Sequence, residues 1–142
     1  MIDRIYVENG VGRSIMEAIN LFTPKHGVTA VWQHDIHPQM QRKQYGDEWW
    51  IEDIASQGMA ILTQDTAILG LAEARQGVIT DERKSIIDHR AHVIALGNAK
   101  YSTWHKLRCV VQHWDLIEEL LRAPGPYAVR LLLSKAAVET FP

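Results

Sequence analysis

Short apolar runs alternate along the chain with longer segments in which apolar residues recur every three or four positions. The short runs predict buried β-strands, because they are rich in β-branched residues and are bounded by Gly, Pro or polar residues. These strands are expected over residues 5–7, 28–32, 59–62, 91–96 and 127–133. The other segments predict helices over 14–21, 47–57, 80–87 and 102–122, with a polar loop over 33–46 and a helical or irregular stretch over 66–76.

This alternation of strands and helices predicts an α/β fold, namely a three-layer α/β/α sandwich with a mostly parallel central sheet. A length of 142 residues with 46% hydrophobic residues is enough for one core, so we expect a single domain spanning residues 1–142. No internal repeat, low-complexity tract or linker divides the sequence.

Composition excludes several classes of protein. The single cysteine, Cys109, rules out an intrachain disulfide framework and a thiolate zinc cluster, and its apolar surroundings predict a core position. No apolar run approaches the roughly 20 residues needed to span a bilayer, and no secretory signal is evident, so we expect a cytoplasmic protein without membrane contact. A net charge of −2 does not itself indicate nucleic-acid binding, but it is compatible with a nuclease whose acids hold metal cations.

Acidic residues occupy positions where strands end and helices begin. Glu8 follows the first predicted strand, Asp65 follows the third, and Asp47 and Glu48 open the helix that precedes the third. The acids at helix starts each have a structural explanation, as caps or partners of the helix dipole, whereas Glu8 has none. In an α/β domain all four positions share one edge of the sheet, where they would form a site for Mg²⁺ or Mn²⁺. Such ions suit phosphodiester hydrolysis, because they activate water and stabilise the departing oxygen.

Four short motifs occur in an order that resembles PIN-like domains. They are Val-Glu-Asn-Gly-Val-Gly-Arg at residues 7–13, Asp-Glu-Trp-Trp-Ile at 47–51, Leu-Thr-Gln-Asp at 62–65 and Pro-Gly-Pro-Tyr at 124–127. The resemblance spans nearly the whole chain and is to the compact bacterial group related to VapC-type toxins and Mut7-C-type domains. It implies a PIN-like fold and metal-dependent ribonuclease activity on RNA, in a protein that is the toxin of a toxin–antitoxin pair.

The resemblance also implies a set of site residues and partners. The family's catalytic acids carry over to Glu8, Asp47, Glu48 and Asp65, of which Glu8, Asp47 and Asp65 are the expected ligands of Mg²⁺ or Mn²⁺. Arg13 is the expected phosphate contact, and Thr63 is expected at the substrate side of the site, where its hydroxyl orients Asp65. RNA and an antitoxin protein are the implied partners. Helical placement puts Trp49 opposite the apolar face of its helix, so it is the candidate for a partner surface or a homodimer contact.

Departures from the family pattern leave a second function open. Glu8 stands where many relatives have Asp, and Gln64 replaces the usual basic residue before the last acid. The acid that relatives carry at the start of a later helix has no clear match, with Asp81 and Asp88 as the candidates. The alternative is therefore a catalytically degenerate PIN-like interaction module, which predicts no binding of Mn²⁺.

Other patterns suggest weaker hypotheses. A phosphoacceptor domain would need a lysine near Asp65, and Lys100 is the only candidate. The histidine pairs His34/His37 and His89/His92 suggest zinc, but no third ligand has zinc spacing. The polar residues His105, Lys106, Arg108 and His113 of the last helix either face solvent or contact RNA, and the tryptophans Trp50, Trp104 and Trp114 are expected in the core or an interface.

Overall fold

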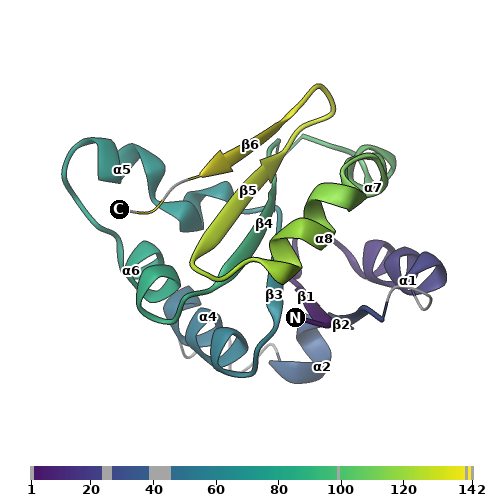
Figure 1. Ribbon diagram of the computed structural model, residues 1–142, viewed down its shortest axis with the longest axis horizontal. Coiled ribbons are helices and arrows are strands. Elements are labelled where there is room, and N and C mark those ends of the chain that lie inside the picture. The colour runs from purple at the N-terminus through teal and green to yellow at the C-terminus, as the bar shows by residue number, and fades with distance from the viewer. Residues whose placement is uncertain (1, 24–26, 39–45, 99, 140, 142) are drawn as a thin grey trace.

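The structure is a computed structural model that describes residues 2–23, 27–38, 46–98, 100–139 and 141. A six-stranded sheet lies at its centre, in the order β2-β1-β3-β4-β5-β6 (Figure 1). The strands are β1 (Arg4–Val7), β2 (Thr29–Trp32), β3 (Ala60–Thr63), β4 (His92–Leu96), β5 (Tyr127–Leu131) and β6 (Ala136–Glu139). Neighbouring strands are parallel except for β5 and β6, which are antiparallel, so the mostly parallel sheet predicted from the alternation is confirmed.

Helices connect the strands and cover the sheet on both faces (Figure 1). They are α1 (Arg13–Phe22), α2 (Gln33–Ile36), α4 (Asp47–Ser56), the 3₁₀ turn η2 (Thr66–Leu69), α5 (Leu71–Arg75), α6 (Asp81–Asp88), α7 (Thr103–Gln112) and α8 (Trp114–Arg122). Apolar residues of α1, α7 and α8 belong to one buried cluster, and those of α4, η2 and α6 belong to a second cluster. This arrangement is compatible with a three-layer sandwich. None of the helices in the described ranges is long and apolar enough to cross a membrane.

The two clusters lie on opposite faces of the sheet because successive side chains of a strand point in opposite directions. In β1, Ile5 and Val7 belong to the cluster under α1, α7 and α8, whereas Tyr6 belongs to the cluster under α4 and α6. Leu62 and Ile61 of β3 divide between the clusters in the same way. All five side chains are buried, and each contributes roughly 1.5–3 kcal/mol to stability if it behaves as a typical large core residue.

The prediction of a single helix over residues 102–122 is wrong. The segment forms two helices, α7 and α8, with His113 between them in a non-helical conformation (φ −107°, ψ 19°). The ring Nε2 of His113 lies 2.8 Å from the carbonyl oxygen of Leu132, which ties the break to the loop between β5 and β6. The apolar stripe continues across His113, and for that reason the periodicity alone shows no interruption.

Smaller differences occur at the ends of other elements. The segment predicted as a polar loop over 33–46 begins with the short helix α2, and residues 39–45 of it lie outside the described ranges. The last predicted strand ends at Leu131 rather than at residue 133, and the edge strand β6 was not predicted. Cys109 is buried as expected, and burial raises the pKa of its thiol. Trp50 and Trp114 are core residues, whereas Trp104 is exposed.

The carboxyl ends of β1 and β3 lie side by side at one edge of the sheet. Val7 of β1 pairs with Leu62 of β3, and the backbone N–H of Glu8 donates to the carbonyl of Leu62 at 2.9 Å. The parallel pairing therefore extends one residue beyond β1. Because the register is fixed at this point, the side chains that follow the two strands are brought close together.

Candidate functional site

Glu8 and the segment after β3 form one polar cluster at this edge. The hydroxyl of Thr63, the last residue of β3, lies 3.4 Å from Glu8 Oε2 and accepts a hydrogen bond from the backbone N–H of Asp65 at 3.0 Å. Thr63 is fully buried. Thr63 thus links the two acids, and it orients Asp65 through the backbone of that residue.

Asp65 both caps a turn and lies at a pocket, so the structural and the functional interpretations of this acid are compatible. Its Oδ1 accepts a hydrogen bond from the backbone N–H of Ala67 at 3.0 Å, which caps the 3₁₀ turn η2. The carboxylate also lines a pocket, together with Glu8. The capping hydrogen bond therefore holds the Asp65 side chain in place beside the pocket.

Burial raises the pKa of Glu8 above its ordinary value. Hydrogen bonds from the backbone N–H of Gly10 and from Thr63 act in the opposite direction, whereas the negative charge of Asp65 adds to the increase. In the described part of the chain neither carboxylate forms an ion pair with a basic side chain. A cation placed between the two acids would reverse this effect and favour their charged forms.

The pocket beside the two acids has a volume of about 450 Å³. It is lined by Glu8, Gly10, Gln64, Asp65, Thr66 and Ala67. Gly10 leaves room for the Glu8 carboxylate, since a Cβ at this position would lie 3.1 Å from Glu8 Oε2. The ammonium group of Lys106, on α7, donates to the carbonyl of Gly10 at 3.0 Å. A positive charge therefore lies beside a pocket whose ionisable lining groups are both acidic.

The loop after β1 is held in place by α2. The buried side chain of Gln33 accepts a hydrogen bond from the backbone N–H of Asn9 at 2.8 Å. His34 Nε2 lies 2.8 Å from the Asn9 side-chain oxygen. Gln33 was not singled out from the sequence, because a glutamine after a strand carries no local signal of such a contact. It fixes the backbone next to Glu8 and so helps to position the site.

The two acids of α4 have other contacts. Asp47 accepts a hydrogen bond from the indole N–H of Trp50 at 2.9 Å. Glu48 lines a separate pocket of about 240 Å³ between α4 and α6, which contains Asp81, Lys84 and Asp88. In the described ranges neither Asp47 nor Glu48 contacts Glu8 or Asp65, and no group of three or more His, Cys, Asp or Glu side chains is placed to hold a metal ion. The structure therefore brings together Glu8, Thr63 and Asp65 of the predicted set.

Arg13, the predicted phosphate contact, begins α1 and lies 3.3 Å from Glu17 on the next turn. It does not line the pocket beside Glu8. Trp49, the predicted dimer contact, is only partly exposed and its ring packs 4.8 Å from that of His37.

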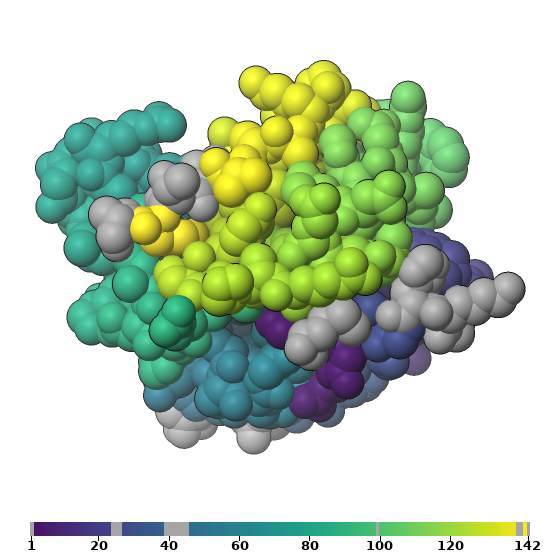
Figure 2. Space-filling view, in the orientation of Figure 1, coloured from purple at the N-terminus to yellow at the C-terminus, as the bar shows by residue number. Residues whose placement is uncertain are grey.

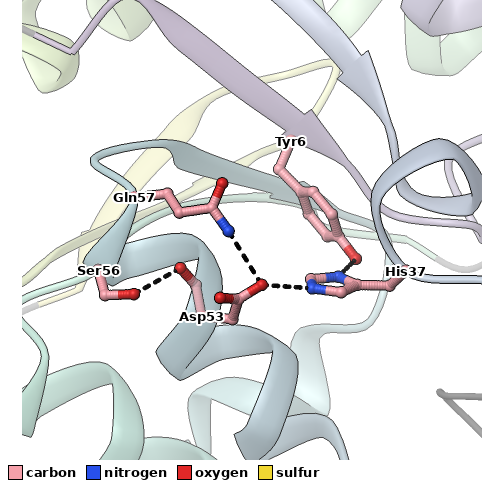
Figure 3. A network of polar contacts seen from close by, with 5 residues as sticks. All are labelled: Tyr6, His37, Asp53, Ser56 and Gln57. Carbon is pink, nitrogen blue, oxygen red and sulfur yellow. Dashed lines mark hydrogen bonds and ion pairs between the residues drawn. The ribbon is translucent and has the colours of Figure 1, made fainter.

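A polar network built on the buried residues Tyr6 and His37 lies on the face of β1 that is covered by α4 (Figure 3). The Tyr6 hydroxyl lies 2.7 Å from His37 Nδ1, and His37 Nε2 lies 2.6 Å from Asp53 Oδ2. Gln57 donates to the same Asp53 oxygen at 3.0 Å, and Ser56 donates to the Asp53 carbonyl at 2.8 Å. The network connects β1, the residue after α2 and the last turn of α4, so it holds α4 against the sheet.

The histidine pairs suggested for zinc are used in other ways. His37 belongs to the buried network, whereas His34 faces Asn9. In the second pair, His92 lies 2.5 Å from the carbonyl of Ala123 and His89 lies near Glu52. Within the described ranges neither pair belongs to a group of three or more side chains that could bind a metal ion.

No family model, curated protein or solved structure matches the chain. The pocket beside Glu8 and Asp65 is therefore the main basis for a functional hypothesis.

Proposed function

We propose that this chain is a PIN-like, metal-dependent ribonuclease that hydrolyses phosphodiester bonds of RNA at the pocket beside Glu8 and Asp65. The observation that supports this most directly is the juxtaposition of two carboxylates after neighbouring strands, facing one pocket, with no basic side chain of the described residues paired to either. Like charges held together in this way cost stability unless a cation offsets them. A site that binds a divalent cation accounts for the arrangement.

The chemistry of the donor groups fits Mg²⁺ or Mn²⁺. Magnesium is commonly held by one or two protein carboxylates, with water and substrate phosphate supplying the other oxygens. Glu8 and Asp65 would hold the ion, and the buried Thr63 hydroxyl would keep the two acids close to each other. The bound ion would supply activation of water and stabilisation of the leaving oxygen. The family resemblance would add Asp47 and Glu48 to this set.

The chain's own residues would receive the phosphate at the edge of the pocket. Lys106 carries a positive charge beside Gly10, whereas Gln64, in the position where relatives have a basic residue, carries none. Lys106 would partly replace that missing charge. Its direct contact with the Gly10 carbonyl keeps the ammonium group close to the acids.

The first experiment measures cleavage of single-stranded and structured RNA by the purified protein with Mn²⁺, Mg²⁺ or EDTA. The test variant is Asp65→Asn, because Asn is also a good N-cap and preserves the turn at η2 while it removes the charge. The matched control is Asp115→Asn, at the first turn of α8 and outside this pocket. Cleavage that needs metal, is lost in Asp65→Asn and persists in Asp115→Asn supports the proposal. Metal-dependent cleavage that survives Asp65→Asn contradicts the site.

The same assay with Asp47→Asn and Glu48→Gln tests the acids of α4. If they act at the same site, each substitution lowers the cleavage rate by at least about tenfold, as loss of a metal-orienting group typically does. If cleavage is unchanged, the two residues serve the contacts with Trp50 and α6 described above.

A catalytically degenerate interaction module is the second candidate. It is favoured by the absence, in the described ranges, of a third acid beside Glu8 and Asp65. Calorimetric titration with Mn²⁺ separates the two candidates, since the module predicts no heat of binding and no cleavage. The proposal that the chain is the toxin of a pair would be tested by co-expression with the product of a neighbouring small gene, which should suppress the ribonuclease activity.

A further inference from the structure

One face of α7 presents an aromatic ring, a guanidinium group and an aliphatic side chain to solvent. Trp104 is 65% exposed and Val111 is 54% exposed, and Arg108, between them in sequence, is also exposed. The spacings of four and three residues place all three on the same side of the helix. We call these residues the α7 stripe. Among the residues that the structure describes, the Trp104 ring has no hydrogen-bond or ring partner.

The α7 stripe begins at the same edge of the sheet as the pocket. α7 follows β4, and β4 pairs with β3, after which Asp65 lies. Trp104 is in the first turn of α7, and Lys106 in the same turn reaches the Gly10 carbonyl at the pocket. In Figure 1, α7 lies at the upper right of the molecule, above α1. The space-filling view shows this green segment at the surface next to the yellow hairpin (Figure 2).

The first turn of α7 is well anchored. Ser102 caps the helix by accepting from the backbone N–H of His105 at 3.3 Å. The rings of Tyr101 and His105 pack edge to face, and the Tyr101 hydroxyl accepts from the backbone N–H of Leu133. Trp104 therefore projects from a fixed backbone, which lowers the entropy cost of placing a ligand against its ring.

The charge of this region differs from that of the whole chain. The net charge is −2, yet no Asp or Glu occurs between Asp88 and Asp115. The same interval contains the cations Arg90, Lys100, Lys106 and Arg108. A ligand that complements this region carries repeated negative charge and at least one planar apolar ring, and single-stranded nucleic acid has both.

We propose that the α7 stripe is the docking surface for single-stranded RNA, with a base stacked on Trp104 and a backbone phosphate on Arg108. The choice of RNA rests on the proposed function, since the strand would pass around the first turn of α7 to Lys106, on the other side of the helix, and into the pocket beside Glu8 and Asp65. Base stacking on an exposed tryptophan with nearby cations is sequence-tolerant, so the surface favours single strands over duplexes and discriminates weakly between bases.

Binding is measured in EDTA, so that it is separated from cleavage. The probes are a fluorescein-labelled single-stranded oligoribonucleotide of mixed sequence, the DNA of the same sequence, and the RNA duplex. Trp104→Ala and, independently, Arg108→Ala should each weaken binding of the single-stranded RNA by about fivefold or more. The matched controls are Leu21→Ala, which removes another exposed apolar side chain, and Arg122→Ala, which removes an exposed arginine at the end of α8. Circular dichroism verifies that all four variants are folded.

The outcomes separate this inference from the proposed function. Weaker RNA binding in both stripe variants with unchanged controls supports the inference, even if the wild-type protein cleaves nothing. Metal-dependent cleavage with RNA affinity unchanged in both stripe variants overturns the inference and leaves the ribonuclease proposal standing. A wild-type protein that binds no RNA in EDTA also overturns it. If Trp104→Ala instead converts a dimer into a monomer, without a change in RNA binding, the stripe is a protein interface and the inference is wrong.

Discussion

The strand β1 contributes to two polar regions that differ in how their charges are balanced. On one face, Tyr6 belongs to a network in which His37 lies between the tyrosine hydroxyl and the carboxylate of Asp53 (Figure 3). At the strand end, Glu8 lies near a second acid, Asp65, and no basic side chain in the described ranges pairs with either. The first region is internally complementary, whereas the second has an excess of negative charge.

The comparison contrasts a region that stabilises the fold with a region that we propose binds a ligand. A buried network whose donors and acceptors match one another stabilises a unique packing. Two nearby carboxylates that face a pocket lower stability, and under the proposed function a bound cation would offset that cost. The predictions below test this difference, from the largest expected effect on stability to the smallest.

His37→Ala should destabilise the protein by about 2–4 kcal/mol, because it removes a buried partner of both Tyr6 and Asp53 and leaves a cavity. The free energy of unfolding is measured by urea denaturation. Ser56→Ala is the control from the same network, because the Ser56 hydroxyl is exposed and the expected loss is under about 0.5 kcal/mol. Equal effects of the two substitutions would mean that the network contributes nothing beyond a surface hydrogen bond.

Mn²⁺ should stabilise the wild-type protein by about 2.7 kcal/mol when its concentration is 100 times the dissociation constant. The same ion should leave the melting temperature of Asp65→Asn unchanged, because this variant keeps the cap but lacks the charge. Differential scanning fluorimetry at several Mn²⁺ concentrations measures both. A stabilisation of Asp65→Asn as large as that of the wild type would show that the ion binds away from the pocket.

Much of the fold is predictable from the sequence, for reasons that particular elements illustrate. The five parallel strands are short, β-branched and bounded by breakers, and each lies within two residues of its predicted ends. The prediction of a single helix over 102–122 was wrong, because the break at His113 depends on a contact with Leu132, which is distant in the sequence. The edge strand β6 was missed because Ala136, Ala137 and Val138 give little β-branched or aromatic signal.

The candidate site is likewise predictable from the sequence in part only. The proximity of Glu8 and Asp65 follows from topology, since residues after neighbouring parallel strands meet at one edge. The contacts of Asp47 and Glu48 depend on how α4 is rotated against Tyr6 and α6, and periodicity does not determine that rotation. The bond between His37 and Asp53 joins residues that are 16 positions apart in the sequence, so no local sequence pattern predicts it.

Glu8→Gln should make the protein more stable than the wild type at pH 7 in EDTA. Burial raises the pKa of Glu8 in the folded state, so the fold favours the protonated carboxyl and loses stability as pH rises through the interval between the unfolded and folded pKa values. Gln is neutral at every pH and avoids this loss. The advantage should shrink as pH falls toward the ordinary value of 4.5, which urea denaturation at several pH values measures. An advantage that is the same at pH 4 and pH 7 would exclude the charge as its cause.

Gln33→Ala should lower the free energy of unfolding by about 1 kcal/mol, because it removes the partly buried hydrogen bond that the backbone N–H of Asn9 donates to the Gln33 side chain. Its effect on the site should be larger than this loss suggests, since Asn9 adjoins Glu8 and a shift of the loop moves a proposed metal ligand. Calorimetry should therefore show weaker Mn²⁺ binding in Gln33→Ala than in Asn20→Ala, which removes two side-chain hydrogen bonds with the backbone of Ala30, away from the pocket. Equal Mn²⁺ affinity in the two variants would mean that Glu8 is positioned by β1 and Thr63 alone. A loss of Mn²⁺ affinity in Gln33→Ala alone would show that α2 helps to position the ligand-binding region, whereas the Tyr6–His37–Asp53 network would keep a purely structural role.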